Sequence, residues 1–354
     1  YNSGCYASGT HAFASYIAHR EADSGLDLTG VMMSDIYDQF SSGVVTPEAI
    51  RSFLAYAFDN WNGPTGLAPA PAYVLLLGDS SLDYKNILGN AFWVNDVPTY
   101  IMYQTNFFLD YYASDTYLSA VVGPDQFPDF HLGRITPRNP AEVATILGKL
   151  TNYDDNPPAG TWRATGMFLA DKGSNAGDTT EFEAISDRFA DTYFVAPFSS
   201  QKLYFDDPNY ANGDASIGPG LWRADYVSKA DAGAALTSYI GHGNFDDWGL
   251  AGLFTGANMP ELSPTGRPSF IINENCLIGG FHFGFGTALG ENFMNAADKS
   301  AIAVLAPSGL SFSTAGDTTL LSAAITKSQA SSALLVLASV QLTHEGGAND
   351  KMVD

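Results

Sequence analysis

Short apolar runs alternate with stretches of helical spacing along most of this chain. The runs that predict β-strands lie at Thr29–Met33, Tyr73–Leu77, Thr165–Ala170, Ser238–Ile240, Ser269–Ile272 and Ala301–Leu305. Between many of them, apolar residues recur at the spacing that places them on one face of a helix. Alternation of strands and helices predicts an α/β fold with a mostly parallel sheet flanked by helices.

Two of the predicted helices carry clear signals for where they begin. The helix over Pro47–Trp61 follows Thr46, a residue suited to the N-cap, and it starts on a proline, which suits the first helical position. A second helix begins after Asn139, with Glu142 at the capping-box position. Weaker helical patterns cover Glu181–Tyr193 and Leu289–Ala297.

The stretch 154–160, Asp-Asp-Asn-Pro-Pro-Ala-Gly, has the composition of a linker. We therefore expect two packed subdomains, an N-terminal α/β subdomain over residues 1–158 and a catalytic α/β subdomain over residues 159–354. The segment Tyr84–Tyr112 is rich in aromatic residues and irregular in pattern, and we predict a long structured loop there.

The charge balance narrows the classes of partner. The chain has 354 residues, with 16 basic and 38 acidic side chains and a net charge of −22. Nucleic acids and anionic membrane surfaces are bound by clustered Lys and Arg, so we expect neither as a partner. No apolar run approaches the roughly 18 residues of a membrane span, and we find no signal peptide in this sequence. The acidity is typical of an extracellular or salt-adapted protein that stays soluble through its charge.

An excess of carboxylates also raises the question of calcium. Asp79, at the end of a predicted strand, and Asp115, in Ala-Ser-Asp-Thr-Tyr, are the candidates, either as ligands of a structural Ca²⁺ or as scaffold for a pocket. The histidines lack partners at metal-ligand spacing, so the sequence does not indicate transition-metal catalysis. We expect the chemistry to need no cofactor.

His242 and Cys276 each follow a predicted strand closely. Ser238–Ile240 leads into Gly-His-Gly, and Ser269–Ile272 leads into Asn-Glu-Asn-Cys. Because parallel strands deliver their carboxyl ends to one edge of a sheet, we expect the imidazole and the thiol to meet there as base and nucleophile. A cysteine is often a buried structural residue, but glycines beside both side chains favour an open site. Cys5, in a stretch of small residues, is interpreted as incidental.

The same edge supplies other groups that acyl transfer needs. The backbone N–H groups of Cys276 and Gly243 are the predicted donors to an oxyanion. Asp171 directly follows the strand Thr165–Ala170, and it is a candidate to orient the imidazole as the third member of a triad. The alternative for Asp171 is an exposed loop carboxylate. Together these residues predict a cysteine peptidase.

Several segments carry a resemblance to a known family. They are Asp35–Phe40, Thr46–Leu54, Tyr73–Asp79, Pro128–Arg134, Tyr239–Gly243, and Cys276 with Gly279 and Phe281. With them the chain resembles, from about residue 12 to about residue 326, the catalytic domain of gingipain-type cysteine peptidases, which have a caspase-like fold. The resemblance implies that His242 and Cys276 form the catalytic dyad. It also implies that Asp171 stands where the family places an acidic partner of the histidine.

The resemblance also bears on the substrate. Gingipains cleave proteins after Arg or Lys and use an acidic residue in the pocket for that side chain. The matching region is Gly173–Glu183, where Asp178 is the nearest acid and Thr179 is the alternative. Arg-specific members carry an aromatic lid after the strand that corresponds to Ala301–Leu305; this chain has Ser-Phe-Ser there, with Phe312, so the lid is altered or displaced. The resemblance implies a bacterial endopeptidase, secreted or at the cell surface, with protein or peptide substrates, and cleavage after Arg or Lys is one hypothesis for it.

Two other functions stay open at this point. One is a surface-displayed adhesion or scaffold module that keeps the fold without activity, and the presence of both His242 and Cys276 argues against it. The other is a sortase-like transpeptidase of a secretion system. Such an enzyme passes through the same thioester but transfers the acyl group to an amine rather than to water.

Overall fold

The chain divides into two compact units, which we describe separately. The computed structural model describes residues 12–26, 28–61, 71–89, 95–103, 111–284, 286–311 and 338–339. The first unit holds residues 1–148, 281–286 and 334–354, and the second holds residues 149–280 and 287–333. The division falls within helix α5 (Pro140–Asp155), whereas the sequence places the boundary after that helix, at residue 158.

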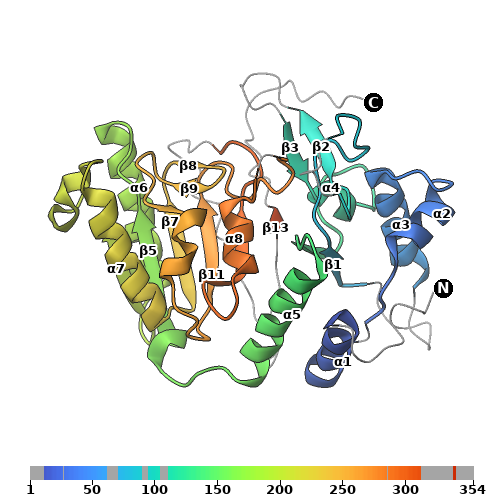
Figure 1. Cartoon of the computed structure of the whole chain (residues 1–354), viewed down its shortest axis with the longest axis horizontal. Coiled ribbons are helices and arrows are strands. Elements are labelled where there is room, and N and C mark those ends of the chain that lie inside the picture. Colours follow the sequence, from blue (N-terminus) through green and yellow to red (C-terminus); the bar gives the residue numbers. More distant parts are fainter. Residues whose placement is uncertain are drawn as a thin grey trace. The chain divides into compact units, whose positions relative to one another are not determined.

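The second unit is built on a parallel sheet. Its strands are β5 (Thr165–Ala170), β6 (Ser199–Tyr204), β7 (Leu236–Ile240), β11 (Ser269–Glu274) and β12 (Ala301–Ala306). They lie in the order β12-β11-β7-β5-β6, and each neighbouring pair is parallel (Figure 1). The predicted mostly parallel sheet is confirmed, and the apolar runs predicted as strands in this unit all lie within it. Strand β6 carries little apolar signal because it is a largely exposed edge strand.

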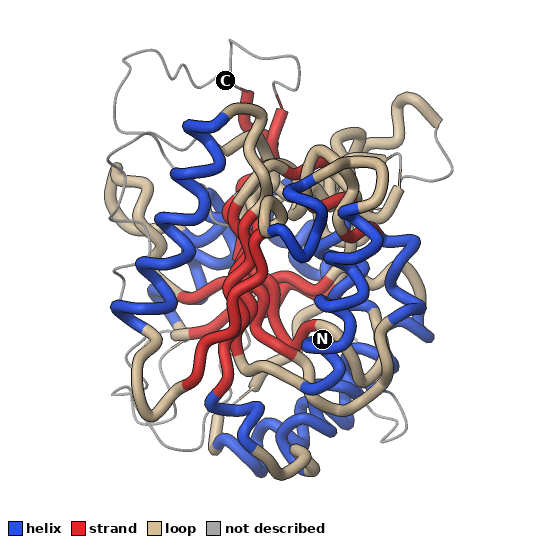
Figure 2. The backbone as a smooth tube through the Cα atoms, turned by 90° about the vertical axis from the view of Figure 1, so that its left-hand side faces the viewer, coloured by secondary structure: helices blue, strands red, loops and turns tan. Residues whose placement is uncertain are grey.

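Helices cover the strands from both sides (Figure 2). Helix α6 (Ala176–Arg188) packs on β5 and β7, and α8 (Leu289–Asn295) packs on β12. The second unit also contains α7 (Gly218–Ala232). Every residue of β5 is buried, as expected for a strand covered on both faces.

The order of the strands creates a switch point in the sheet. From β5 the chain passes to β6 on one side, and it then returns to the other side for β7, β11 and β12. The connections that follow β5 and β7 therefore diverge at their carboxyl ends. In open α/β sheets, ligands bind in the crevice at such a point.

Shorter elements complete the second unit. They are the 3₁₀-helices η1 (Thr161–Ala164), η3 (Pro208–Gly213) and η4 (Gly256–Glu261), the π-helical turn η2 (Phe189–Tyr193), and the antiparallel strands β8 (Gly243–Asn244), β9 (Asp247–Trp248) and β10 (Phe254–Thr255). Helix α6 begins earlier than predicted because Asn175 caps it. The Asn175 side-chain oxygen accepts from the N–H groups of Gly177 and Asp178.

The first unit combines helices with two small sheets. Its helices are α1 (Ala12–Ser24), α2 (Met33–Phe40), α3 (Pro47–Asn60) and α4 (Thr116–Ser119). Strands β1 (Tyr73–Leu77) and β4 (His131–Ile135) form a parallel pair, β2 (Tyr100–Tyr103) and β3 (Tyr111–Ser114) form an antiparallel pair, and β13 (Ala338–Ser339) is a short strand. The predicted strand at 73–77 and the predicted helix from Pro47 are confirmed.

Two predictions for the first unit are wrong. Thr29–Met33 is not a strand, because its apolar residues lead directly into α2, where Val31 and Met33 pack against Ile36 and Ala49. The stretch Tyr84–Tyr112 is not only loop, since it contains β2 and the start of β3. Tyr103 and Tyr111 lie opposite each other on these two strands, with their ring centroids 5.2 Å apart.

The capping signal ahead of α5 is confirmed. The Asn139 side chain accepts from the backbone N–H of Ala141 and of Glu142, and it donates to the Glu142 carboxylate at 2.8 Å. Among the described residues, none of the helices has the length and the apolar character needed to cross a membrane.

Candidate active site

Strands β7 and β11 are neighbours that end level with each other. Ile240, the last residue of β7, is paired with Glu274, the last residue of β11. His242 and Cys276 lie at matching positions beyond these two strand ends. The backbone N–H of Gly241 donates to the carbonyl of Glu274 at 3.2 Å, so the two loops leave the sheet side by side. The structure therefore brings the predicted base and nucleophile to one edge of the sheet.

The glycines on either side of His242 are required by close packing. A β-carbon on Gly241, whose φ is +151°, would lie 2.3 Å from the β-carbon of Asp171. A β-carbon on Gly243 would lie 2.4 Å from the side-chain nitrogen of Asn275. Whereas the sequence suggests that these glycines keep the site open, their structural role is to let the loops after β5, β7 and β11 approach one another.

The backbone of His242 is held on both sides. Its carbonyl accepts from the Tyr239 hydroxyl at 2.8 Å and from the Gly249 N–H at 2.9 Å. Its N–H donates to the Asp171 carboxylate at 3.3 Å. The Tyr239 ring stacks on Trp248 with a centroid distance of 4.7 Å, which fixes the hydroxyl. The imidazole thus projects from a main chain that has little freedom.

Asp171 reaches the predicted edge of the sheet, and it is a buried residue rather than an exposed loop carboxylate, with 2% of its surface accessible. Burial raises its pKa to about 7, while N–H groups of His242, Lys172 and Leu250 oppose that rise. The hydrogen bond from His242 comes from the backbone, and no contact with the imidazole ring is found among the described residues. Asp171 therefore orients His242 through its main chain.

Helix α6 supplies the neighbours of the imidazole. The Phe182 ring meets it edge to face, with a centroid distance of 5.5 Å and an interplanar angle of 88°. The Asp178 carboxylate lies 3.7 Å from Nε2 of His242. Within the described part of the chain, Nε2 is buried and has no hydrogen-bond partner. The carboxylate that faces the ring is thus Asp178, which the resemblance places in the substrate pocket.

Cys276 is a free, half-buried cysteine on the loop after β11. Its Sγ accepts from the backbone N–H of Ser311 at 3.3 Å and lies 3.4 Å from the Ser311 carbonyl. Burial raises the pKa of the thiol, and the Ser311 N–H partly offsets the rise. At neutral pH the sulfur is therefore a thiol, and it needs a base before it can attack.

Polar atoms without partners gather at this edge. Among the described residues, the buried and unpaired atoms here include Oε1 of Glu274, both side-chain polar atoms of Asn275, Oγ of Ser311, and Nε2 of His242. Buried polar groups are nearly always paired, so a cluster without hydrogen-bond partners makes this edge a candidate site for a polar ligand or water. Sequence reasoning missed Glu274, although a carboxylate closing an apolar strand next to Asn-Cys is a signal for it.

The predicted oxyanion donors lie on the two adjacent loops. Gly243 begins β8 directly after His242, and Cys276 follows β11. The contact between Gly243 and Asn275 joins the two loops at this point. The role of these N–H groups stays a prediction. Thr179 lies on α6, but its side chain is outside the described part of the structure, as are Phe312 and Cys5.

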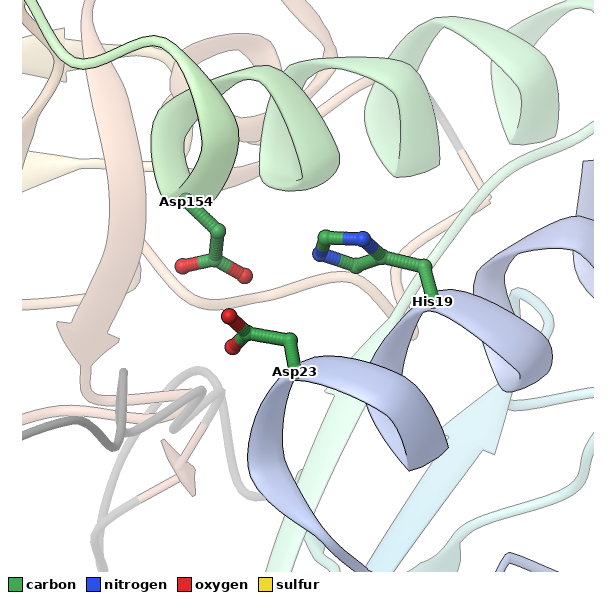
Figure 3. Close-up of side chains that lie close together, drawn as sticks. All are labelled: His19, Asp23 and Asp154. Carbon is green, nitrogen blue, oxygen red and sulfur yellow. The ribbon is translucent and has the colours of Figure 1, made fainter.

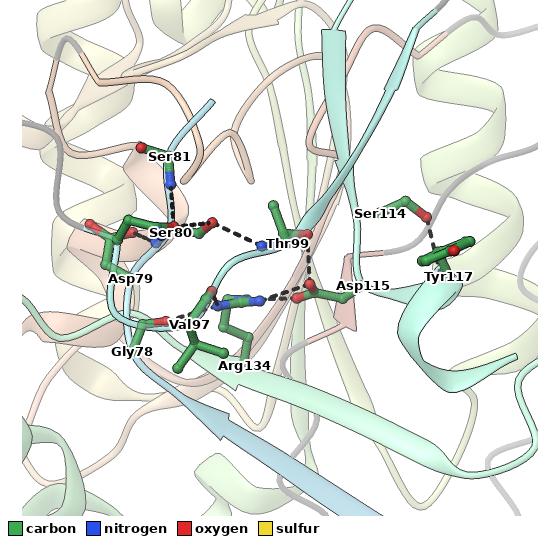
Figure 4. Close-up of polar contacts among 11 residues, drawn as sticks. Gly78, Asp79, Ser80, Ser81, Val97, Thr99, Ser114, Asp115, Tyr117 and Arg134 are labelled. Atoms are coloured by element: carbon green, nitrogen blue, oxygen red, sulfur yellow. Dashed lines mark hydrogen bonds and ion pairs between the residues drawn. The ribbon is translucent and has the colours of Figure 1, made fainter. Parts of the chain in front are cut away.

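Asp79 and Asp115 each bind an arginine of the first unit, and Figure 4 shows the pair of Asp115 with Arg134. Both oxygens of Asp115 accept from Arg134, at 2.7 and 2.9 Å, and one also accepts from the Thr99 hydroxyl at 2.7 Å. Asp79 accepts from Nε of Arg138 at 2.9 Å and from the Ser80 N–H at 2.8 Å. A guanidinium on each carboxylate does not fit a calcium ligand set, so the geometry favours the scaffold role.

Three further side chains are of types that bind metal ions. His19 and Asp23 project from successive turns of α1 in the first unit, and Asp154 belongs to the last turn of α5 in the second (Figure 3). We assign no cation site to these three side chains, because they do not belong to one unit.

Comparison with known proteins finds a matching family. The model of peptidase family C25 matches residues 7–346. No curated protein sequence matches. Among solved structures, the Arg-specific cysteine proteinase gingipain R has 19% sequence identity and a TM-score of 0.60, over 84% of this chain and 60% of that one. A structure described as a protease has 17% identity and a TM-score of 0.64, over 86% of this chain and 58% of that one.

A complex of the pro- and mature domains of RgpB from Porphyromonas gingivalis gives 18% identity and a TM-score of 0.60, over 84% of this chain and 60% of the other. The chain thus spans about three fifths of the length of the solved structures it matches. These likenesses show that the caspase-like α/β fold of the gingipains is also the fold of this chain.

Proposed function

Because this chain belongs to peptidase family C25, we propose that it is a gingipain-type cysteine endopeptidase that cleaves peptide bonds through a thioester on Cys276. The observation that carries the proposal is the matched placement of His242 and Cys276 beyond the paired ends of β7 and β11. The unpaired polar atoms around them support a site that receives peptide groups. The acidic composition supports secretion or display at the cell surface.

The proposed reaction begins with proton transfer from Cys276 to His242. The thiolate attacks the substrate carbonyl carbon, and the resulting oxyanion is stabilised by the backbone N–H groups of Cys276 and Gly243. The C–N bond then breaks as the imidazolium gives its proton to the leaving amine. Water, deprotonated by His242, hydrolyses the thioester and restores the thiol.

Burial of the sulfur makes the base indispensable in this scheme. Since the thiol pKa is raised, little thiolate forms at neutral pH without a proton acceptor beside it. The backbone contacts that hold His242 in place then have a direct function, because an imidazole that is out of position cannot accept the proton from the thiol of Cys276.

Labelling with an electrophilic peptide tests the proposal. We expect the wild-type protein to be labelled at Cys276, the Cys276→Ala variant to be unlabelled, and the His242→Ala variant to react at least about a hundredfold more slowly. Unchanged labelling of the histidine variant, or labelling elsewhere, would refute the dyad. Absence of all labelling would favour an inactive display module. Mass spectrometry of products formed with an added amine separates hydrolysis from the transpeptidase alternative.

Cleavage after Arg or Lys is the finer part of the proposal, and Glu274 supports it. Glu274 shares a row of the sheet with Ile240 and Ala170, so its side chain leaves the face on which those residues pack against Phe182. Its Oε1 is buried without a partner among the described residues. A basic substrate side chain would supply the missing counter-charge.

Peptides with Arg, Lys or a neutral residue before the scissile bond test this preference. We expect kcat/KM to favour the basic peptides, and Glu274→Gln to reduce that preference by about tenfold or more. Since burial raises the pKa of Glu274 to about 7, the preference should grow as the pH rises from 6 to 8. Equal cleavage of the three peptides would exclude it.

A further inference from the structure

Helix α6 presents two side chains to the imidazole of His242. Phe182 meets the ring edge to face at 5.5 Å, and Asp178 lies one helical turn earlier, with its carboxylate 3.7 Å from Nε2. Residues four apart lie on the same face of a helix. The aromatic ring therefore fixes one edge of the imidazole while the carboxylate faces its nitrogen.

Asp178 is itself held in place at the start of α6. Its Oδ2 accepts from the Ser174 hydroxyl at 2.5 Å and from the Ser174 N–H at 3.2 Å. The hydroxyl of Ser174, with help from Asn175 and His242, keeps the pKa of Asp178 below its usual range. Asp178 is thus a fixed negative charge at neutral pH, also at the positive end of a helix dipole.

Asp171 does not provide this charge. Its carboxylate receives the backbone N–H of His242, and burial raises its pKa to about 7, so that it is only partly ionised at neutral pH. The two acids near His242 have separate tasks. Asp171 holds the main chain, and Asp178 faces the ring.

We infer that Asp178 is a positioning residue that pairs with Nε2 of His242 when the imidazolium forms. A charge-assisted N–H···O bond is about 2.7–2.9 Å long, so closing the 3.7 Å gap needs a movement of under about 1 Å. Pairing at Nε2 leaves Nδ1 as the nitrogen that exchanges a proton with Cys276. The inference rests on the proposed function, and it gives Asp178 a task other than binding the substrate side chain.

The two tasks predict different behaviour of the Asp178→Asn variant. If Asp178 binds a basic substrate side chain, the variant loses activity only toward Arg and Lys peptides, mainly through KM. If it positions the imidazolium, kcat falls equally for basic and neutral peptides. Alkylation of Cys276 by iodoacetamide, which has no peptide side chain at all, then slows as well.

Asp214 offers a matched control. It is an exposed aspartate whose Oδ1 accepts from the Ser216 hydroxyl at 2.6 Å and from the Ser216 N–H at 2.8 Å, so that, like Asp178, it is bonded to both groups of one serine. Asp214→Asn therefore removes a carboxylate with the same type of partners from a loop position. We expect it to leave peptidase activity and alkylation unchanged.

The experiment combines two measurements on the whole chain. First, kcat/KM and the iodoacetamide rate are followed against pH for wild type, Asp178→Asn and Asp214→Asn. We expect Asp178→Asn alone to lower both about tenfold near neutral pH and to move the acid limb of the profile, which follows loss of the imidazolium proton, to lower pH. A profile that keeps its shape, or a loss confined to basic peptides, overturns the inference.

Second, the His242 ring is titrated by NMR in a Cys276→Ala background, with and without Asp178→Asn. We expect the titration midpoint to fall when the carboxylate is removed, because the imidazolium loses its counter-charge. An unchanged midpoint overturns the inference even if the protein is inactive. If the wild-type thiol shows no dependence on His242, the proposed function fails instead, and the NMR titration still decides the Asp178 pairing.

Discussion

The Arg134 network of the first unit and the edge beyond β7 and β11 in the second unit differ in how their buried polar groups are paired. In the first, every side-chain nitrogen of Arg134 donates a hydrogen bond. The acceptors are Asp115 and the carbonyls of Gly78 and Val97, at distances of 2.7–2.9 Å. In the second, the edge beyond β7 and β11 leaves Oε1 of Glu274, the Asn275 amide and Nε2 of His242 without a hydrogen-bond partner within the described residues. A closed polar network indicates a structural role, and an open one indicates a site for a ligand.

The difference has an energetic meaning. Unpaired buried groups each cost stability, on the order of 1–3 kcal/mol, and a fold retains them where they serve another purpose. The first unit minimises this cost around its ion pair. The second accepts it beside the thiol, where a substrate's own peptide groups and side chain can provide the partners.

Breaking the closed network should have the largest effect on stability. Arg134→Met leaves Asp115 buried without its counter-ion, and we expect the free energy of unfolding in urea to fall by about 3–5 kcal/mol. The double variant Asp115→Leu with Arg134→Met removes both charges and should recover much of the loss. A single variant as stable as wild type would show that this network is not structural.

Removing the buried charge of Glu274 from the edge beyond β7 and β11 should change stability in the opposite direction and raise the free energy of unfolding. Burial raises the folded-state pKa of Glu274 to about 7, above its unfolded value near 4.5. The group therefore binds its proton more tightly when folded, and its contribution to stability falls as the pH rises from about 4.5 through 7. Glu274→Gln should then stabilise the protein at pH 8 by about 1–3 kcal/mol and have little effect at pH 4.

Urea unfolding at both pH values measures this difference. The exposed Glu21 provides a control, because Glu21→Gln should change stability little at either pH. A Glu274→Gln variant that is less stable than wild type at pH 8 would mean that the carboxylate has a structural partner, and the contrast between the two units would not hold.

The Asp171→Asn variant tests a buried carboxylate of the second unit that, in contrast to Glu274, has hydrogen-bond partners. Asparagine keeps the size of the side chain but presents an amide to the N–H groups that Asp171 accepts, so we expect a loss of about 1 kcal/mol in unfolding free energy. Because the backbone of His242 shifts, kcat should fall about tenfold without any change in preference among substrates. A loss of preference with unchanged kcat would place Asp171 in the substrate pocket instead.

Removal of calcium with a chelator should have the smallest effect on stability. Asp79 and Asp115 are each paired with an arginine, so we expect neither to bind calcium. A chelator titration should therefore leave the melting temperature unchanged. A melting temperature that falls on chelation and recovers with added Ca²⁺ would show binding. If Asp79→Asn or Asp115→Asn then abolished the response, our assignment of these residues to a scaffold would be wrong.

Prediction from the sequence succeeded where the signal is local. The runs at 165–170 and 301–305 are apolar because both faces of those strands are covered, and the capping pattern at Asn139 is complete in its own segment. It failed at Thr29–Met33, where apolar residues pack beside a helix instead of pairing in a sheet. It missed β6 because an exposed edge strand carries no apolar pattern.

For the site, the sequence by itself determined that His242, Cys276 and Asp171 follow strands, and in a parallel sheet that fact is enough to bring them to one edge. Only the tertiary structure decided which atoms meet. The register of β7 with β11 set the thiol loop beside the histidine loop, and the packing of α6 on β5 and β7 placed Asp178 against the ring. Such pairings depend on contacts between segments distant in the chain, and neither local propensity nor residue spacing encodes them.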